Sequence, residues 1–248
     1  MPALERLTIV GCSLLSSLSL RSHCLRRLLL RGTRGLGELD LRCPQLEEVA
    51  IEPQSPGLAA AAGLRHISLA SHAVQRLAWA AFPSLREVVL QCPNLLELDL
   101  SECSQLRDSV FESMGAASGY QGPDHLVPSC PRLRVLKLVE CDGLRSVALA
   151  SSSLECLQMS QCRGILGVQL DCPSLTALAL EECTALEAAR LRSNCMTVSA
   201  RWGGRAAAGR GGSGWGVLLC RFGLRGSSAA HHVCTPWPGA LGCWSCQP

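Results

Sequence analysis

Lysine, aromatic residues and long apolar runs are scarce in this chain of 248 residues. It contains one lysine, Lys137, and aromatic residues make up only 4% of it. The core must therefore be built from aliphatic side chains, chiefly Leu. Residues 1–196 hold 18 basic and 20 acidic groups. Because phosphate backbones are bound by clustered Lys and Arg, this balance predicts no nucleic-acid partner.

The sequence also lacks the marks of a secreted or membrane protein. No stretch approaches the roughly 18 uninterrupted apolar residues of a membrane span. The first residues, MPALERLTIV, place Glu5 and Arg6 where the apolar segment of a signal peptide begins. We therefore expect no membrane partner and a cytoplasmic or nuclear location, where the sixteen cysteines stay as free thiols.

Leucine recurs along the chain with a fixed spacing. Six-residue units of the type Leu-x-x-Leu-x-Leu begin alternately 10 and 11 residues apart, from Leu4 to Leu186. Two insertions interrupt this alternation, which resumes in phase after each. The pattern defines a repeat of 21 residues and about eight coils. A helical pattern would drift with a 3.6-residue period, so the strict spacing indicates a repeat architecture.

Each unit predicts a strand. In LLELDLSEC, Leu98 and Leu100 alternate with Glu97 and Asp99, so the leucines share one face and the acids the other. One coil cannot bury its leucines alone, and stacked coils form a parallel sheet. We predict a leucine-rich-repeat solenoid, α/β or mainly β, shaped as a horseshoe or rod, with strands in both half-repeats and little helix.

Nine cysteines fall into register with the repeat. They lie eight residues after a first-half start or three residues before one, and several of the second kind precede Pro; the nine are Cys12, Cys43, Cys92, Cys103, Cys130, Cys141, Cys162, Cys172 and Cys183. Ser22, Ser71 and Ser151 take the place of Cys in other coils. A small inward donor can bond a backbone carbonyl that the turn leaves unpaired. The 21-residue recurrence is unlike zinc-ligand spacing, so we interpret these cysteines as structural and expect no metal.

The units LRVLKLVEC, LECLQMSQC and LTALALEEC, joined to a Cys-Pro-x-Leu entry, resemble the cysteine-containing leucine-rich repeats of F-box proteins. The succession LREVVLQCPNLLELDLSECSQLRDSVF, then CPRLRVLKLVECDGL, is similar to plant F-box/leucine-rich-repeat proteins of the short-repeat "protein fifteen" type. The resemblance covers residues 4 to about 195. It implies a non-catalytic protein without cofactor, which recognises protein substrates for an SCF-type E3 ubiquitin ligase in ubiquitin-dependent protein degradation.

One departure from that family concerns its adaptor. The first repeat starts at Leu4 and no F-box precedes it, so a Skp-type adaptor is an expected partner only of a longer form that carries an F-box. Two alternatives stay open, namely a stand-alone intracellular scaffold unrelated to ubiquitin and a metal or redox protein acting through its tail. A small molecule that bridges the solenoid and its target is also compatible with the sequence.

The expected domains are a solenoid over residues 1–196 and a Gly/Arg/Trp/Cys-rich tail over 197–248, disordered or an artefact of the gene model. Insertions lie near residues 52–63, a surface loop, and 112–129, preceded by a short helix near Leu106–Met114. The tail contains HHVC and CWSC, which are compatible with metal or redox chemistry, and GRGGSG, which is compatible with RNA or phosphate binding. None of them stands in the strand and helix pattern, or has the complete motif, that such sites require.

No catalytic constellation is evident. The chain has no Gly-x-Ser-x-Gly and no His-Glu-x-x-His motif. His23, His66, His72 and His125 fall in different coils or loops without a matched acid, so we interpret them as ordinary surface or turn residues. We expect no enzyme.

The outward positions of the first-half strands are the candidate partner-binding face. The residues singled out there are Arg27, Arg31, Glu48, Glu97, Asp99 and Lys137. They can read a protein target, as repeat solenoids do. Alternatively, opposite charges in neighbouring coils pair with each other across strands and leave the face self-satisfied.

Overall fold

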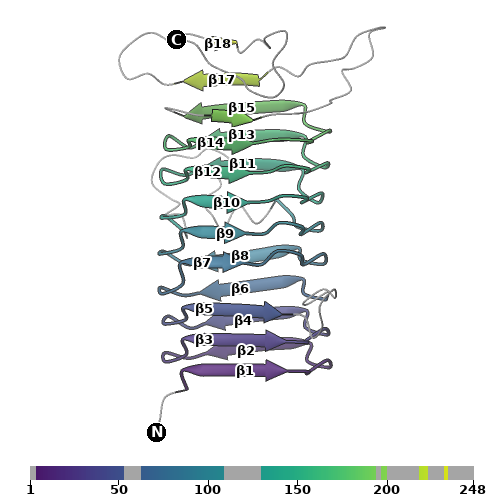
Figure 1. Cartoon of the computed structure of the whole chain (residues 1–248), viewed down its shortest axis with the longest axis vertical. Coiled ribbons are helices and arrows are strands. Elements are labelled where there is room, and N and C mark those ends of the chain that lie inside the picture. Colours follow the sequence, from purple (N-terminus) through teal and green to yellow (C-terminus); the bar gives the residue numbers. More distant parts are fainter. Residues whose placement is uncertain are drawn as a thin grey trace.

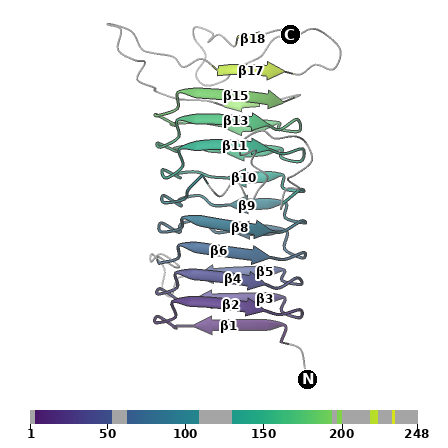
Figure 2. The same ribbon diagram turned by 180° about the vertical axis from the view of Figure 1, so that it is seen from behind.

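The computed structural model describes residues 4–52, 63–108 and 130–193, together with the strand segments 197–199, 218–222 and 232–233. Strands are stacked along the long axis of a rod, from the purple N-terminal end to the yellow C-terminal end (Figures 1 and 2). The described residues contain no helix. The solenoid prediction is confirmed in its mainly β, rod-like form.

The first half of every coil forms a strand at its expected place. The strands are β1 (Arg6–Val10), β3 (Arg27–Arg31), β5 (Glu48–Glu52), β7 (Arg76–Ala78), β9 (Glu97–Asp99), β10 (Val135–Lys137), β12 (Cys156–Gln158) and β14 (Ala177–Ala179). Each begins two residues after the start of its leucine unit. They pair in parallel, with residues one coil apart in register, as Arg6 with Arg27 and Cys156 with Ala177.

The second halves form the opposite side of the rod. Their strands are β2 (Ser17–Arg21), β4 (Glu38–Arg42), β6 (His66–Ala70), β8 (Glu87–Gln91), β11 (Ser146–Ala150), β13 (Gly167–Asp171) and β15 (Ala188–Ser193). Residues 106–108, at the start of the second half of the fifth coil, form no strand. The helix expected near Leu106–Met114 lies from residue 109 onward outside the described residues.

Three short strands of the tail belong to the same sheets. β16 (Thr197–Ser199) pairs with β14, β17 (Leu218–Phe222) pairs with β15, and β18 (His232–Val233) pairs antiparallel with β17. The rest of the predicted tail, including CWSC, lies outside the described residues, and the prediction for it stays a prediction.

Each insertion interrupts one sheet and spares the other. First-half strands form one sheet of order β1-β3-β5 and another of order β16-β14-β12-β10-β9-β7, so the break falls between β5 and β7, beside the first insertion. Second-half strands form sheets of order β2-β4-β6-β8 and β11-β13-β15-β17-β18, with the break at the second insertion. At each break the other sheet is continuous, through β4 and β6 or through β9 and β10.

The core lies between the two sides and consists of columns of aliphatic side chains. Leu30, Leu100 and Leu138 hold equivalent positions in the second, fifth and sixth coils and are fully buried. In the fourth coil Trp79 takes the equivalent Leu position and Phe82 the Cys position, and both are buried. The two aromatic side chains therefore fill the interior positions that the smaller Leu and Cys side chains occupy in other coils.

A left-handed backbone residue recurs directly before the Cys position of every coil except the third, where that position lies outside the described residues. Its φ is 70° at Gly11 and 66° at Gly32, and it lies between 58° and 62° at Ala81, Glu102, Glu140, Gln161 and Glu182. This conformation reverses the chain at the end of the first-half strand. It is natural for glycine and strained for other residues. The leucine pattern contains no signal for it.

Candidate partner-binding face and cysteine ladders

The first-half face is defined here as the outward side chains of β1, β3, β5, β7, β9, β10, β12 and β14 together with the residue preceding each strand. All six sequence-predicted partner-binding residues lie on it. Leucines at alternate positions of these strands point inward, which fixes the charged residues between them on the outside.

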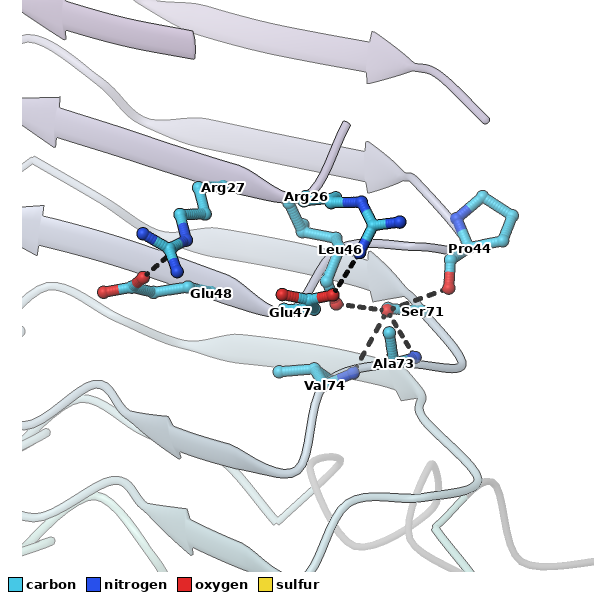
Figure 3. Close-up of polar contacts among 9 residues, drawn as sticks. All are labelled: Arg26, Arg27, Pro44, Leu46, Glu47, Glu48, Ser71, Ala73 and Val74. Atoms are coloured by element: carbon cyan, nitrogen blue, oxygen red, sulfur yellow. Dashed lines mark hydrogen bonds and ion pairs between the residues drawn. The ribbon is translucent and has the colours of Figure 1, made fainter. Parts of the chain in front are cut away.

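Ion pairs link neighbouring coils at the N-terminal end of this face. Nε of Arg27 lies 3.6 Å from Oε2 of Glu48, its register partner on the next strand. Just before the same two strands, Nη1 of Arg26 donates a hydrogen bond of 2.9 Å to Oε1 of Glu47. The two pairs run side by side from coil to coil (Figure 3). The second of them was not among the sequence-predicted residues.

The pairing continues further along the rod. Nε of Arg76 lies 3.5 Å from Oε1 of Glu97, and Nζ of Lys137 lies 4.0 Å from Oδ2 of Asp99. Arg134 donates two hydrogen bonds to Glu155, of 2.9 and 2.8 Å. The hydrogen bonding to Glu155 and the negative charge of Glu155 raise the pKa of Arg134 above its ordinary value.

Five of the six predicted residues are therefore engaged with other coils, as the self-pairing hypothesis expects. The exception is Arg31, which ends β3 opposite Glu52 and has no ion pair within the described ranges. Exposed ion pairs contribute only about 0–1 kcal/mol each. A partner can therefore exchange them for its own contacts at small cost, and partner binding by these residues stays a prediction.

The cysteines that follow the first-half strands form a ladder of thiol hydrogen bonds. Sγ donates to a backbone carbonyl of the preceding coil in each case, from Cys103 to Trp79 (3.4 Å), Cys141 to Leu100 (3.1 Å), Cys162 to Leu138 (2.8 Å) and Cys183 to Met159 (2.9 Å). All four thiols are buried. Each bond ties one turn of the rod to the turn before it.

A second ladder follows the second-half strands with longer bonds. Cys43, Cys92 and Cys172 donate to the carbonyls of Leu20, Leu69 and Leu149 at 3.8, 3.7 and 3.7 Å. Cys130 at the same repeat position is buried as well.

Cys12, at the first ladder position, differs from the other ladder cysteines because no coil precedes it in the described chain. It is exposed, and its thiol contacts only the Val10 carbonyl of its own strand, at 3.7 Å.

Serine at the second ladder position makes different bonds from cysteine. Oγ of Ser71 donates to the carbonyl of Leu46 (2.7 Å) and accepts the N–H of Ala73 (3.1 Å) and of Val74 (3.4 Å), as Figure 3 shows. Ser22 and Ser151 also accept the N–H groups two and three residues further on. Serine therefore closes its own turn, which cysteine does not do, and Ser71 also bonds the preceding coil as the cysteines do.

Burial makes most of the ladder thiols poor nucleophiles. It raises the pKa of Cys103, Cys130 and Cys172 to about 11 and of Cys92 and Cys141 to about 12. The hydrogen bond with Cys183, together with burial, raises the pKa of Cys162. A thiol acts as nucleophile or metal ligand in its thiolate form, which these sites disfavour.

No metal site emerges among the residues that the structure describes. Nowhere in them do three His, Cys, Asp or Glu side chains come together in a way that could hold an ion. Nδ1 of His66 lies 3.4 Å from Oε2 of Glu87, so this histidine has an acidic neighbour that the sequence did not indicate. His125 and the cysteines of CWSC lie outside the described ranges.

No helix long and apolar enough to cross a membrane occurs among the described residues.

Comparison of the chain with models of protein families, with curated proteins and with solved structures finds no match.

Proposed function

We propose that this chain is a protein-binding repeat scaffold that presents its first-half face to a protein target. Its role in the proposal is substrate recognition for an SCF-type E3 ubiquitin ligase, in ubiquitin-dependent protein degradation. The observation that carries the proposal is the ladder of exposed charges on this face, from Arg27 and Glu48 to Lys137 and Asp99. The link to ubiquitin rests on the resemblance of the repeats to those of F-box proteins.

The face has properties that suit a protein partner. Its charges are exposed, so a target can reach them, and from Arg27 to Glu97 they alternate in sign along the rod. Such alternation gives specificity through complementary charge on the target. The backbone beneath is held by parallel strand pairing, which places the charges on a rigid frame. Rigid presentation lowers the entropy cost of binding.

A charge-swap experiment separates internal pairing from partner recognition. The double variant Arg27→Glu/Glu48→Arg keeps the ion pair but reverses its polarity. We expect it to unfold at a urea concentration no lower than that of the unaltered chain, because the change also removes the like-charge contact between residue 27 and Arg6. If the face reads a target, crosslinking capture from cell lysate, quantified by mass spectrometry, will show the target's yield reduced at least about tenfold. Unchanged capture by this variant, and by Arg76→Glu/Glu97→Arg, would contradict the assignment of the face.

A matched pair of single variants tells the two sides of the rod apart. Gln158 is the last residue of β12 and Gln169 the central residue of β13; both point outward, on opposite sides of the rod. Gln158→Arg adds bulk and charge to the proposed face, and we expect it to reduce capture of the target. Gln169→Arg makes the same chemical change on the other side and should leave capture intact. The reverse result would move the binding site to the second-half strands.

The ubiquitin part of the proposal needs its own test, because a stand-alone scaffold binds through the same face. In this proposal the repeats are the part that binds the target, so an excess of a polypeptide of these 248 residues should occupy the target and shield it from the ligase. We expect overexpression to lengthen the half-life of the captured protein, and a proteasome inhibitor to abolish that difference. A half-life that does not change, with capture intact, would favour the stand-alone scaffold.

A further inference from the structure

A pocket of about 300 Å³ opens on the second-half side of the rod, away from the first-half face. It lies at the ends of β2, β4 and β6 and is called the basic pocket here. Its walls are Arg21, Ser22, His23, Arg42, Pro44, Ala70 and His72. No acidic residue belongs to this lining. A volume of this size suits a small polar group with a few attached atoms.

The repeat itself brings these side chains together. Arg21, Arg42 and Ala70 are register partners on three successive strands. The small side chain of Ala70 leaves space beside the two guanidinium groups. His23 and His72 hold the same place two coils apart in the turns that follow, with Pro44 between them.

Like charges directly opposite each other on neighbouring strands destabilise a sheet. On the first-half side the structure relieves such a contact, because Arg27, the register partner of Arg6, pairs with Glu48. In the basic pocket the repulsion between Arg21 and Arg42 is only partly offset by carboxylates. Nε of Arg42 lies 3.7 Å from Oδ2 of Asp40 on its own strand, and no carboxylate of the described residues lies within 4.0 Å of Arg21. The pocket therefore keeps an excess of positive charge.

The backbone around the pocket is already hydrogen-bonded, which leaves the side chains for a ligand. Ser22 N–H donates to the Arg42 carbonyl (3.3 Å), and His72 N–H donates to the Pro44 carbonyl (3.0 Å). Ser22 Oγ accepts two turn N–H groups at 3.2 Å. The remaining donors are two guanidinium groups and two imidazoles, and a neutral imidazole still carries one N–H.

We propose that the basic pocket binds a phosphate group, with the guanidinium groups of Arg21 and Arg42 as its principal ligands. Arginine matches phosphate oxygens with pairs of parallel N–H donors. His23 and His72 close the pocket from the turns and donate to the remaining oxygens. The phosphate neutralises the facing arginines, so binding stabilises the fold as well. The site lies on the opposite side from the proposed target face and does not depend on the proposed function.

Two sources of the phosphate share this chemistry, namely a phosphorylated side chain and free inorganic phosphate. Isothermal titration calorimetry on the full chain distinguishes them, with a blocked phosphoserine tripeptide, its unphosphorylated form and sodium phosphate as probes at constant ionic strength. We expect the phosphorylated tripeptide to bind and the unphosphorylated form not to bind. Tighter binding of the tripeptide than of inorganic phosphate assigns the site to phosphorylated chains, and equal binding assigns it to the free anion.

Variants locate the site. Arg21→Gln and Arg42→Gln should each weaken phosphate binding about tenfold, since each removes charge-assisted hydrogen bonds. The control is Arg65→Gln, which removes an exposed arginine from the opposite end of β6 and should change affinity less than about twofold. Ala70→Glu places a carboxylate in the hollow, so we expect it to abolish phosphate binding and to raise the melting temperature.

Three results would overturn the proposal. They are absence of binding by both phosphate probes at millimolar concentration, equal loss on Arg65→Gln and Arg21→Gln, and a lowered melting temperature with undiminished binding in Ala70→Glu. The Arg21 and Arg42 side chains are exposed, so their replacement leaves the core untouched. Far-ultraviolet circular dichroism of each variant checks that the fold is intact.

Discussion

Oδ2 of Asp108 accepts two hydrogen bonds from Ser146, one from its backbone N–H and one from its hydroxyl, both of 3.0 Å. The other carboxylate oxygen accepts the N–H of Arg145 at 2.8 Å. In other coils a backbone carbonyl plays this part, as when Gly37 accepts the N–H groups of Arg65 and His66. At the second insertion a side chain therefore replaces the backbone that joins two coils.

Removing the Asp108 carboxylate should weaken the rod at this junction. We expect Asp108→Ala to lower the free energy of unfolding by about 1–2 kcal/mol, since three hydrogen bonds to a charged but partly exposed acceptor are lost. Asp108→Asn keeps one acceptor oxygen and should lose less. Urea denaturation measures both. Glu187→Ala is the control, because this exposed carboxylate comes just before β15 without such bonds. A loss for Glu187→Ala as large as for Asp108→Ala would contradict the bridging role.

The buried thiols predict a loss of stability in alkaline solution. Their pKa is raised from the ordinary value of 9.0 to about 11 or 12 in the folded chain, so the folded state binds protons more tightly than the unfolded state. The stabilisation is complete below about pH 9 and is lost as the pH rises towards 12. The chain has one Lys and one Tyr, so few other groups titrate in this range.

Urea denaturation at pH 8 and at pH 10.5 tests the predicted loss of stability in alkaline solution. Each raised pKa unit corresponds to about 1.4 kcal/mol, so the free energy of unfolding should fall by several kcal/mol between these conditions. Cys141→Ala lacks one such thiol and should lose about 1–2 kcal/mol less over the same interval. An equal fall in the variant would show that Cys141 does not contribute. A free energy that is constant between pH 8 and pH 10.5 would contradict the prediction for the whole ladder.

Thr33 occupies the Cys position of the second coil, where its hydroxyl is buried and has no hydrogen-bond partner. Leaving a buried hydroxyl unsatisfied costs about 1–3 kcal/mol. We therefore expect Thr33→Val, which keeps the shape and removes the hydroxyl, to raise the free energy of unfolding by about 1 kcal/mol. Thr33→Cys should stabilise the chain as well, by adding a rung to the ladder. Thermal unfolding measures both, and a destabilised Thr33→Val would mean that the hydroxyl has a partner.

The left-handed residues predict a stabilising glycine. Glu140 has a φ of 58°, a conformation that costs an L-residue about 1–2 kcal/mol. The first two coils already have glycine at this place, Gly11 and Gly32. Glu140→Gly should therefore raise the free energy of unfolding by about 0.5–1 kcal/mol after the loss of chain entropy. Gln169→Gly, in the extended strand β13, is the control and should destabilise. Equal effects at the two sites would rule out backbone strain as the cause.

Most of the strands could be predicted because inward leucines impose a two-residue alternation that only a strand satisfies. The ladder cysteines could be placed for the same reason, as could the pairing of Arg27 with Glu48, since residues one coil apart face each other. The left-handed turn could not be predicted, because Glu140 and Gln161 carry none of the glycine signal that this conformation favours. Asp108 was missed because its partners lie 37 and 38 residues later, beyond an insertion.

The basic pocket was equally hidden from the sequence. Comparison of His23 and His72 with their neighbours along the chain gives no relation between them. They line one pocket because three coils stack and because Ala70 is small where Arg21 and Arg42 are large. Such a site depends on the order of side-chain sizes down a column, which becomes visible once the register is known.

The staggered breaks in the two sheets determine how the rod carries load. Among the described residues, strand pairing crosses the break between β5 and β7 through β4 and β6, and the break between β8 and β11 through β9 and β10. Hydrogen bonds between parallel strands resist a pull along the axis, so at each break the paired strands of one side of the rod carry this resistance without strand pairing on the other. The two breaks lie on opposite sides, and bending the rod one way opens the first while it closes the second. The two breaks thus divide the described strand pairing into three segments, and the pairing that joins neighbouring segments changes from one side of the rod to the other.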